Sequence, residues 1–174
     1  SRFYNIREDE YGGDIAGRTR FAREIVEEVR KRLGNDFPIS FKISAEEYVD
    51  SGLTTKESVE ILKILVSAGI DIVQVSAGND VTAEWICQPM FMEKGCLVES
   101  ADQVKKALDI PVMAVGRINE PQLANEIIKR KNADLVCIGR GLLADPEMPK
   151  KALEGRLDEI RTCIACNTCM QSIF

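Results

Sequence analysis

The stretch IDIVQVS, residues Ile70 to Ser76, decides the fold class of this chain, because three other runs share its length and character. Those runs are Pro38–Ser44 (PISFKIS), Pro111–Gly116 (PVMAVG) and Asp134–Gly139 (DLVCIG). Their apolar, largely β-branched residues follow one another with few interruptions, which is typical of parallel strands that are buried on both faces. The sequence therefore predicts four strands of a parallel sheet.

Helical patterns separate these strands. Apolar residues at helical spacing occupy residues 21–33, ahead of a glycine that suits a helix end. Thr54 with Glu57, and Ser100 with the glutamine three residues later, form capping-box signatures, and Asn119 suits the start of another helix. Strands and helices thus alternate, as in βαβ units.

Two architectures fit this alternation: a small doubly wound open sheet, or part of a (β/α)₈ barrel. A whole barrel takes eight strands and about 250 residues. A chain of 174 residues with four predicted strands could supply only half of one.

Composition excludes several classes of function. The formal net charge is −5, and basic and acidic residues are interspersed, so we expect neither a nucleic-acid nor a membrane partner. The absence of histidine removes Ser-His and Cys-His catalytic pairs and all His-bearing metal sites. With no signal-peptide pattern and no transmembrane run, the sequence predicts a cytoplasmic protein whose six cysteines are thiols or metal ligands.

The third and fourth predicted strands end in the same dipeptide, Gly116-Arg117 and Gly139-Arg140. Glycine lets a backbone N–H approach a ligand closely, and arginine offers a forked cation suited to phosphate oxygens. In (β/α)₈ enzymes the loops after the last two strands, together with a short extra helix, frequently bind phosphate. The run Arg140–Ala144 could form that helix, so the sequence predicts a phosphate site here.

A lysine interrupts the first predicted strand. A charged side chain in a buried run needs a partner, so Lys42 is expected to reach an anion or a ring heteroatom at the carboxyl end of the strand. Alternatively, Lys42 extends from an exposed edge strand into water. The same two interpretations apply to Gln74 in the second strand.

The carboxyl-terminal segment carries Cys163, Cys166 and Cys169 in a C-x-x-C-x-x-C run. Three thiolates from one tight turn suit an iron–sulfur cluster better than a zinc site, which typically uses two separated pairs. The alternative is three unrelated thiols. A fourth ligand has to come from elsewhere, and the simpler expectation is that it belongs to sequence downstream and is absent from this chain. Cys87 and Cys96 in the long connection 77–98 remain open as sources, whereas the cysteine at 137 is predicted to be a buried strand residue.

These motifs, taken in order along the chain, resemble the Old Yellow Enzyme family of FMN-dependent (β/α)₈ oxidoreductases. The resemblance is to the branch with an iron–sulfur cluster, which includes 2,4-dienoyl-CoA reductase, trimethylamine dehydrogenase and enoate reductases. The matching segments are NIREDEYGG (5–13), Gly17-Arg18, FKIS (41–44), VSAG (75–78), both Gly-Arg turns, LLADPEM (142–148) and the cysteine run.

This resemblance implies roles for the residues singled out above. Lys42 would contact the flavin ring near N1 and the C2 carbonyl. Gly116, Arg117, Gly139 and Arg140 would hold the FMN phosphate, and the loop with Gln88 would lie over the flavin. The three cysteines of the run would be three of the four [4Fe-4S] ligands.

The resemblance also implies an activity. The whole enzyme would take hydride from NAD(P)H onto FMN and pass it to an electron-poor alkene, an enoate or enoyl-CoA type of substrate. The alternatives are an amine dehydrogenase or demethylase of the same family, or a non-catalytic phosphate-binding half barrel.

The family comparison further predicts how the chain is organised. Residues 1–160 would be strands five to eight of the barrel, and residues 161–174 the truncated start of the cluster segment. The substrate-orienting His or Asn pair and the proton-donating tyrosine of the family belong to the first four strands, so no catalytic residue is assigned and this fragment alone is expected to be inactive. Half a barrel leaves two strand edges unpaired, which could support a homo-oligomer.

Overall fold

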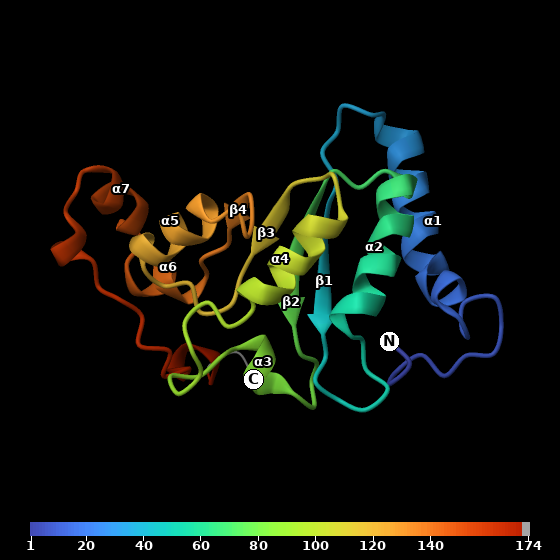
Figure 1. Cartoon of the computed structure of the whole chain (residues 1–174), viewed down its shortest axis with the longest axis horizontal. Helices are drawn as coiled ribbons and strands as arrows, with labels where there is room; N and C mark the ends of the chain where they lie inside the picture. The colour runs from blue at the N-terminus through green and yellow to red at the C-terminus, as the bar shows by residue number, and fades with distance from the viewer. Residues whose placement is uncertain (172–174) are drawn as a thin grey trace.

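The computed structural model describes residues 1–171 and contains one parallel sheet of four strands in the order β1-β2-β3-β4 (Figure 1). The strands are β1 (Ser40–Glu46), β2 (Ile72–Ala77), β3 (Val112–Ala114) and β4 (Leu135–Val136). Sequential strands are neighbours throughout, as in one side of a barrel. The prediction of four parallel strands alternating with helices is confirmed.

Strand register fixes which side chains stand beside one another. Lys42 of β1 pairs with Gln74 of β2, which in turn pairs with Met113 of β3. Ala114 of β3 pairs with Val136 of β4. The last two strands are shorter than the sequence predicted, at three and two residues.

Helices connect the strands and cover them. The α-helices are α1 (Ile15–Leu33), α2 (Thr55–Ala68), α3 (Ala83–Ile86), α4 (Val98–Ala107), α5 (Pro121–Lys129), α6 (Arg140–Ala144) and α7 (Met148–Leu153). Two 3₁₀ turns follow, η1 (Leu157–Glu159) and η2 (Thr168–Met170). Helix α2 packs on β1, α4 packs on β2 and β3, and α1 packs on α2 outside the sheet (Figure 1).

The hydrophobic core lies between the sheet and the helices that cover it. Val73, Val75 and Val112 of the strands and Leu62 of α2 are completely buried. On β1, however, Ile43 is buried whereas the adjacent lysine at 42 is exposed. Burial on both faces of the sheet, which the sequence predicted, is therefore wrong for β1 in this chain, because the helices packed on it cover one face only.

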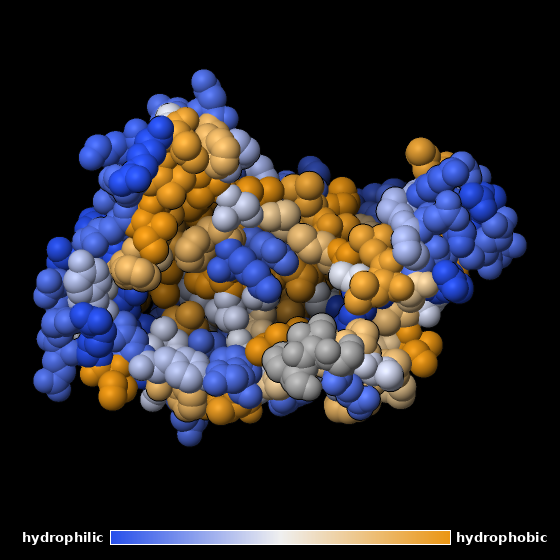
Figure 2. Space-filling model, turned by 180° about the vertical axis from the view of Figure 1, so that it is seen from behind, coloured by the Kyte–Doolittle hydropathy of each residue, from blue (hydrophilic) through white to orange (hydrophobic). Residues whose placement is uncertain are grey.

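The outer face of α1 is apolar and exposed. Phe21 is 66% exposed, Ile25 48% and Leu33 52%, whereas Val26 on the other side of the helix is buried. Figure 2 shows hydrophobic residues along this helix at the left of the view and across the middle of the same face of the molecule.

The helix starts test the capping predictions. Thr54 is confirmed, because its Oγ1 accepts a hydrogen bond from the backbone N–H of Glu57 at 3.3 Å. Ser100 is not a cap: α4 already begins at Val98, and the Ser100 side chain is buried within that helix. Asn119 is not a cap either, because its side chain bonds elsewhere and Glu120 precedes α5.

The long connection between β2 and α4 is ordered by packing. It contains the single turn α3, and Leu97 at its end is 1% exposed. Trp85 of α3 stacks on Tyr48, which follows β1, with ring centroids 3.6 Å apart and an interplanar angle of 14°. Trp85 thus packs this connection against the loop that follows β1.

Within residues 1–171, β1 and β4 are the two edge strands of the sheet. Association through these edges stays a prediction. Within residues 1–171, no helix is both long and apolar enough to span a membrane.

Candidate functional site

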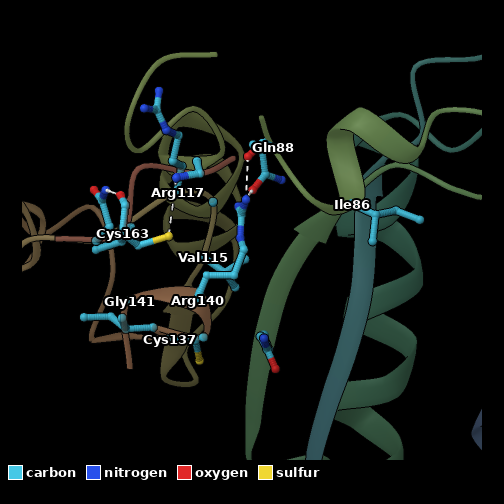
Figure 3. Close-up of a pocket in the computed structure, with 15 residues that line it drawn as sticks. Ile86, Gln88, Val115, Arg117, Cys137, Arg140, Gly141 and Cys163 are labelled. Atoms are coloured by element: carbon cyan, nitrogen blue, oxygen red, sulfur yellow. Dashed lines mark hydrogen bonds between the residues drawn. The ribbon is translucent and has the colours of Figure 1, made fainter. Parts of the chain in front are cut away.

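A cavity of about 330 Å³ opens at the carboxyl ends of β2, β3 and β4 (Figure 3). Gln74 of β2 contributes to its wall. The residues that follow β3 and β4 supply most of the rest, including Gly116, Arg117, Gly139 and Arg140. The structure thus brings together all four residues of the two Gly-Arg turns, because parallel strands present their carboxyl ends at one edge of the sheet.

The two glycines differ in backbone conformation and in the space around them. Gly116 has a φ of 107°, in the region that favours glycine, and a Cβ built there would lie 2.7 Å from Cγ of Leu97. Gly139 has a φ of −92°, and nothing lies within 4 Å of a Cβ built on it. Gly116 is therefore required by the backbone and by packing, whereas Gly139 leaves open space in the cavity wall.

Arg117 is bound to the long connection above the sheet. Its Nη1 donates to the carbonyl oxygen of Met92, while its Nε is buried and has no hydrogen-bond partner among residues 1–171. A buried guanidinium N–H without an acceptor is costly, so a ligand oxygen that reached this nitrogen would remove that cost.

Arg140 is held more firmly. Its Nη1 donates to the carbonyl oxygen of Gln88 at 2.7 Å and to Oδ1 of Asn167, and its Nη2 lies 3.5 Å from Oε1 of Gln88. Gln88 is only 2% exposed. Figure 3 shows the Arg140 side chain pointing toward Gln88, whereas the guanidinium of Arg117 points away from both.

The carboxyl-terminal segment forms another wall of this cavity. Cys163 and Ala165 line it, and Asn119 donates from Nδ2 to the carbonyl oxygen of Cys163 at 2.5 Å. Asn167 donates from its own Nδ2 to the carbonyl oxygen of Cys87 at 2.8 Å. The cysteine run therefore lies against the two Gly-Arg turns, although α6, α7 and η1 separate it from the second turn along the chain, and α5 and β4 separate it further from the first.

The three thiols of the run do not converge on one point. Within residues 1–171, no three Cys, His, Asp or Glu side chains lie close enough together to hold a metal ion. Cys166 is exposed, and a hydrogen bond with Thr168 lowers the pKa of its thiol. Cys163 and Cys169 are half-buried. The assignment of these residues as cluster ligands stays a prediction.

The other three cysteines are half-buried. Burial raises the pKa of the thiols of Cys87, Cys96 and Cys137. Cys137 lines the cavity with its Sγ 3.7 Å from Sδ of Met113. Cys137 is half-buried and lies one residue beyond β4, so the prediction of a buried strand residue is wrong in both respects.

Lys42 lies outside the cavity wall. It is exposed on the edge strand β1 and makes no hydrogen bond or ion pair within residues 1–171, which matches the alternative of a lysine that extends into water. Its register neighbour Gln74 lines the cavity. The two side chains lie next to each other at the same level of the sheet.

Sequence reasoning missed three residues that shape this site. The resemblance placed Gln88 in a loop over the flavin without a contact of its own, Asn119 was predicted to cap a helix, and Asn167 was given no role. The signal that could have found Gln88 is its position in a long connection rich in apolar residues, where a polar side chain must find a partner. Nothing local distinguishes the two asparagines.

Two guanidinium groups, two glycine turns and an N–H without an acceptor make this cavity suited to an anion. Among residues 1–171, the described side chains that line it include no carboxylate. A phosphate group would meet cations here without facing a charge of its own sign.

Comparisons with known proteins identify the family and the fold of this chain. Residues 1–159 match the family described as NADH:flavin oxidoreductase / NADH oxidase. The chain is 47% identical to an NADH oxidase of Thermoanaerobacter brockii, over 94% of the chain and 25% of that protein. It is 37% identical to a cinnamate reductase of Clostridium sporogenes, over 94% of the chain and 27% of that protein.

A solved structure of 2-naphthoyl-CoA reductase in complex with 2-naphthoyl-CoA superimposes with a TM-score of 0.89. Its sequence is 32% identical, and the match covers 96% of this chain and 26% of that one. The chain thus spans about a quarter of the length of each of these three proteins. The family match over nearly the whole sequence and the parallel strands with their shared cavity lead to one conclusion: this chain belongs to the NADH:flavin oxidoreductase / NADH oxidase family.

Proposed function

We propose that this chain supplies the FMN phosphate site of an NAD(P)H-dependent reductase that acts on electron-poor alkenes of the enoate or enoyl-CoA type. The observation that carries this proposal is the buried Nε of Arg117, which has no acceptor among residues 1–171 although it lies beside an anion-suited cavity. The names of two similar proteins, a cinnamate reductase and a 2-naphthoyl-CoA reductase, support the substrate class.

The residues present fit the phosphate end of FMN. Arg117 and Arg140 would donate to phosphate oxygens, and Gly116 and Gly139 would let the ligand approach the backbone. A Cβ at Gly139 would point into space that a ligand could use.

When bound, FMN would supply the transfer of hydride from the nicotinamide to the alkene. The residues of this chain bind and orient. Gln74 lines the same cavity as the two Gly-Arg turns, and its carboxamide would donate or accept a hydrogen bond at a polar atom of the flavin ring. Lys42 would add a cation near that edge, since it is the register neighbour of Gln74 on β1.

The three cysteines do not fit a cluster as they are arranged in residues 1–171, so no step of the reaction is derived through one. A [4Fe-4S] centre at Cys163, Cys166 and Cys169 stays a proposal from the family resemblance. Iron and sulfide analysis of the whole protein would test it.

The proposal is tested on the whole protein that contains this chain. It should bind FMN with yellow absorbance, bind riboflavin more weakly, and oxidise NADH or NADPH when cinnamate is added. Arg140→Ala should weaken FMN binding about 10- to 100-fold, as expected for loss of a charged hydrogen bond, and change riboflavin binding little. Absence of flavin binding would overturn the proposal, and turnover of methylamines instead of enoates would replace the substrate class.

A further inference from the structure

Asn167 connects the cysteine segment, residues Cys163 to Cys169, to Arg140 in the wall of the cavity. It lies between Cys166 and Cys169, is half-buried, and has a φ of 60°. Asparagine tolerates this left-handed conformation better than most side chains do. The backbone here turns the carboxamide inward, toward Arg140 and Cys87.

Both ends of this carboxamide are used. Oδ1 accepts from Nη1 of Arg140, and the thiol of Cys87 lies 3.4 Å from the same oxygen. Nδ2 donates to the carbonyl oxygen of Cys87 at 2.8 Å. Asn167 therefore fixes Arg140 on one side and the connection after α3 on the other.

The anchoring leaves part of the Arg140 guanidinium for a ligand. Nη1 is shared by the carbonyl oxygen of Gln88 and Oδ1 of Asn167. Nη2 has only the 3.5 Å contact with Gln88, and Nε makes no hydrogen bond within residues 1–171. Nη1 is thus held by protein oxygens, whereas Nε and most of Nη2 keep their hydrogen-bonding capacity in a side chain that lines the cavity.

We propose that Asn167 is a positioning residue for Arg140, and that the cysteine segment thereby sets the affinity of the phosphate site. This inference rests on the function proposed above. An arginine held in its binding orientation loses less side-chain entropy when a ligand arrives, so pre-organisation shows directly in affinity. By linkage, phosphate bound at Arg140 would stabilise the observed path of the cysteine segment to the same extent.

The test is a double-mutant cycle on the whole protein, with FMN and riboflavin as probes. Asn167→Gly removes the carboxamide, and glycine keeps the left-handed backbone without strain. We expect FMN to dissociate with a Kd about 10-fold higher, within the usual range of coupling between sites, and riboflavin to bind unchanged. In an Arg140→Ala background the same substitution should have no further effect on FMN.

Two comparisons keep the test specific. Asn132→Ala removes an amide whose Nδ2 donates to Asp102 at 3.2 Å, away from the cavity, and should leave both affinities unchanged. Asn167→Ala provides a second variant if the glycine loosens the segment, and circular dichroism checks that each protein is folded.

The outcomes separate the two proposals. If Asn167→Gly weakens FMN and riboflavin equally, leaves both unchanged, or still weakens FMN in the Arg140→Ala background, Asn167 does not act through Arg140 and the inference is overturned. The proposed function would survive that result as long as Arg140→Ala weakens FMN by itself. If the unmodified protein binds no flavin, the proposed function fails first.

Discussion

Asn119 donates a hydrogen bond from its Nδ2 to the carbonyl oxygen of Cys163 at 2.5 Å, across 44 residues of sequence. Asn119 is only 4% exposed, and its Oδ1 is buried with no partner among residues 1–171. The loop after β3 thus holds the start of the cysteine run with a single buried amide. This contact predicts how the segment responds when the amide is lost.

Asn119→Ala should lower the free energy of unfolding by about 1–2 kcal/mol, because the Cys163 carbonyl loses its donor inside the protein. The backbone amides around residue 163 should also exchange with deuterium faster, since the segment is no longer held. Urea denaturation and hydrogen exchange measure the two effects. Asn35→Ala, on the exposed turn after α1, is the control and should change neither.

A matched pair of glycines tests the backbone of the anion site. Gly116→Ala should destabilise the protein by about 1–3 kcal/mol, because alanine is strained at a φ of 107° and its Cβ would lie 2.7 Å from Cγ of the buried Leu97. Gly139→Ala should change stability by no more than about 0.5 kcal/mol, since nothing lies within 4 Å of its Cβ position. Equal losses in chemical denaturation of the two variants would contradict this account.

The stacked rings of Tyr48 and Trp85 join the loops after β1 and β2. Their geometry predicts a coupling free energy of about 0.5–1.5 kcal/mol in a double-mutant cycle of Tyr48→Leu and Trp85→Leu. Tyr48→Phe retains the ring and should retain the coupling. A cycle with no coupling would show that the two loops are positioned by other contacts.

Acid should weaken the junction between β3 and β4. Asp134 accepts from Lys105 Nζ at 2.5 Å and from the backbone N–H of Val112 at 2.9 Å, and these two contacts lower the pKa of its carboxyl group. Because the folded pKa lies below the unfolded value of about 3.9, the stabilisation is complete above that pH and is lost as pH falls through the folded pKa.

The corresponding variant is Asp134→Asn. It should lower stability at pH 7 and make the decline below about pH 4 shallower than in the unmodified protein. Urea denaturation at a series of pH values measures this slope. The control is Asp36→Asn, at an exposed carboxylate that makes no hydrogen bond within residues 1–171, and it should leave the slope unchanged. An equal effect of both variants would show that the contacts of Asp134 do not cause the acid sensitivity.

Local sequence predicted the elements well where the signal is itself local. The strand runs were recognisable from their β-branched residues, and Thr54 was recognisable as a cap because a cap acts within three residues. Ser100 and Asn119 satisfy the same local rules but are recruited elsewhere. A polar side chain binds the partner that the fold brings to it, and that partner can lie far away in the sequence.

The sequence by itself determined the parallel strands, their order of alternation with helices, and the two Gly-Arg turns at one edge of the sheet. These follow from periodicity and from the geometry of βαβ units. Only the tertiary structure decided that Lys42 is exposed, that Gln88 is buried against Arg140, and that Asn167 reaches the same arginine. Such contacts depend on which loops lie against one another at the carboxyl ends of the strands. That arrangement is set by packing between residues far apart in the sequence, which no local pattern encodes.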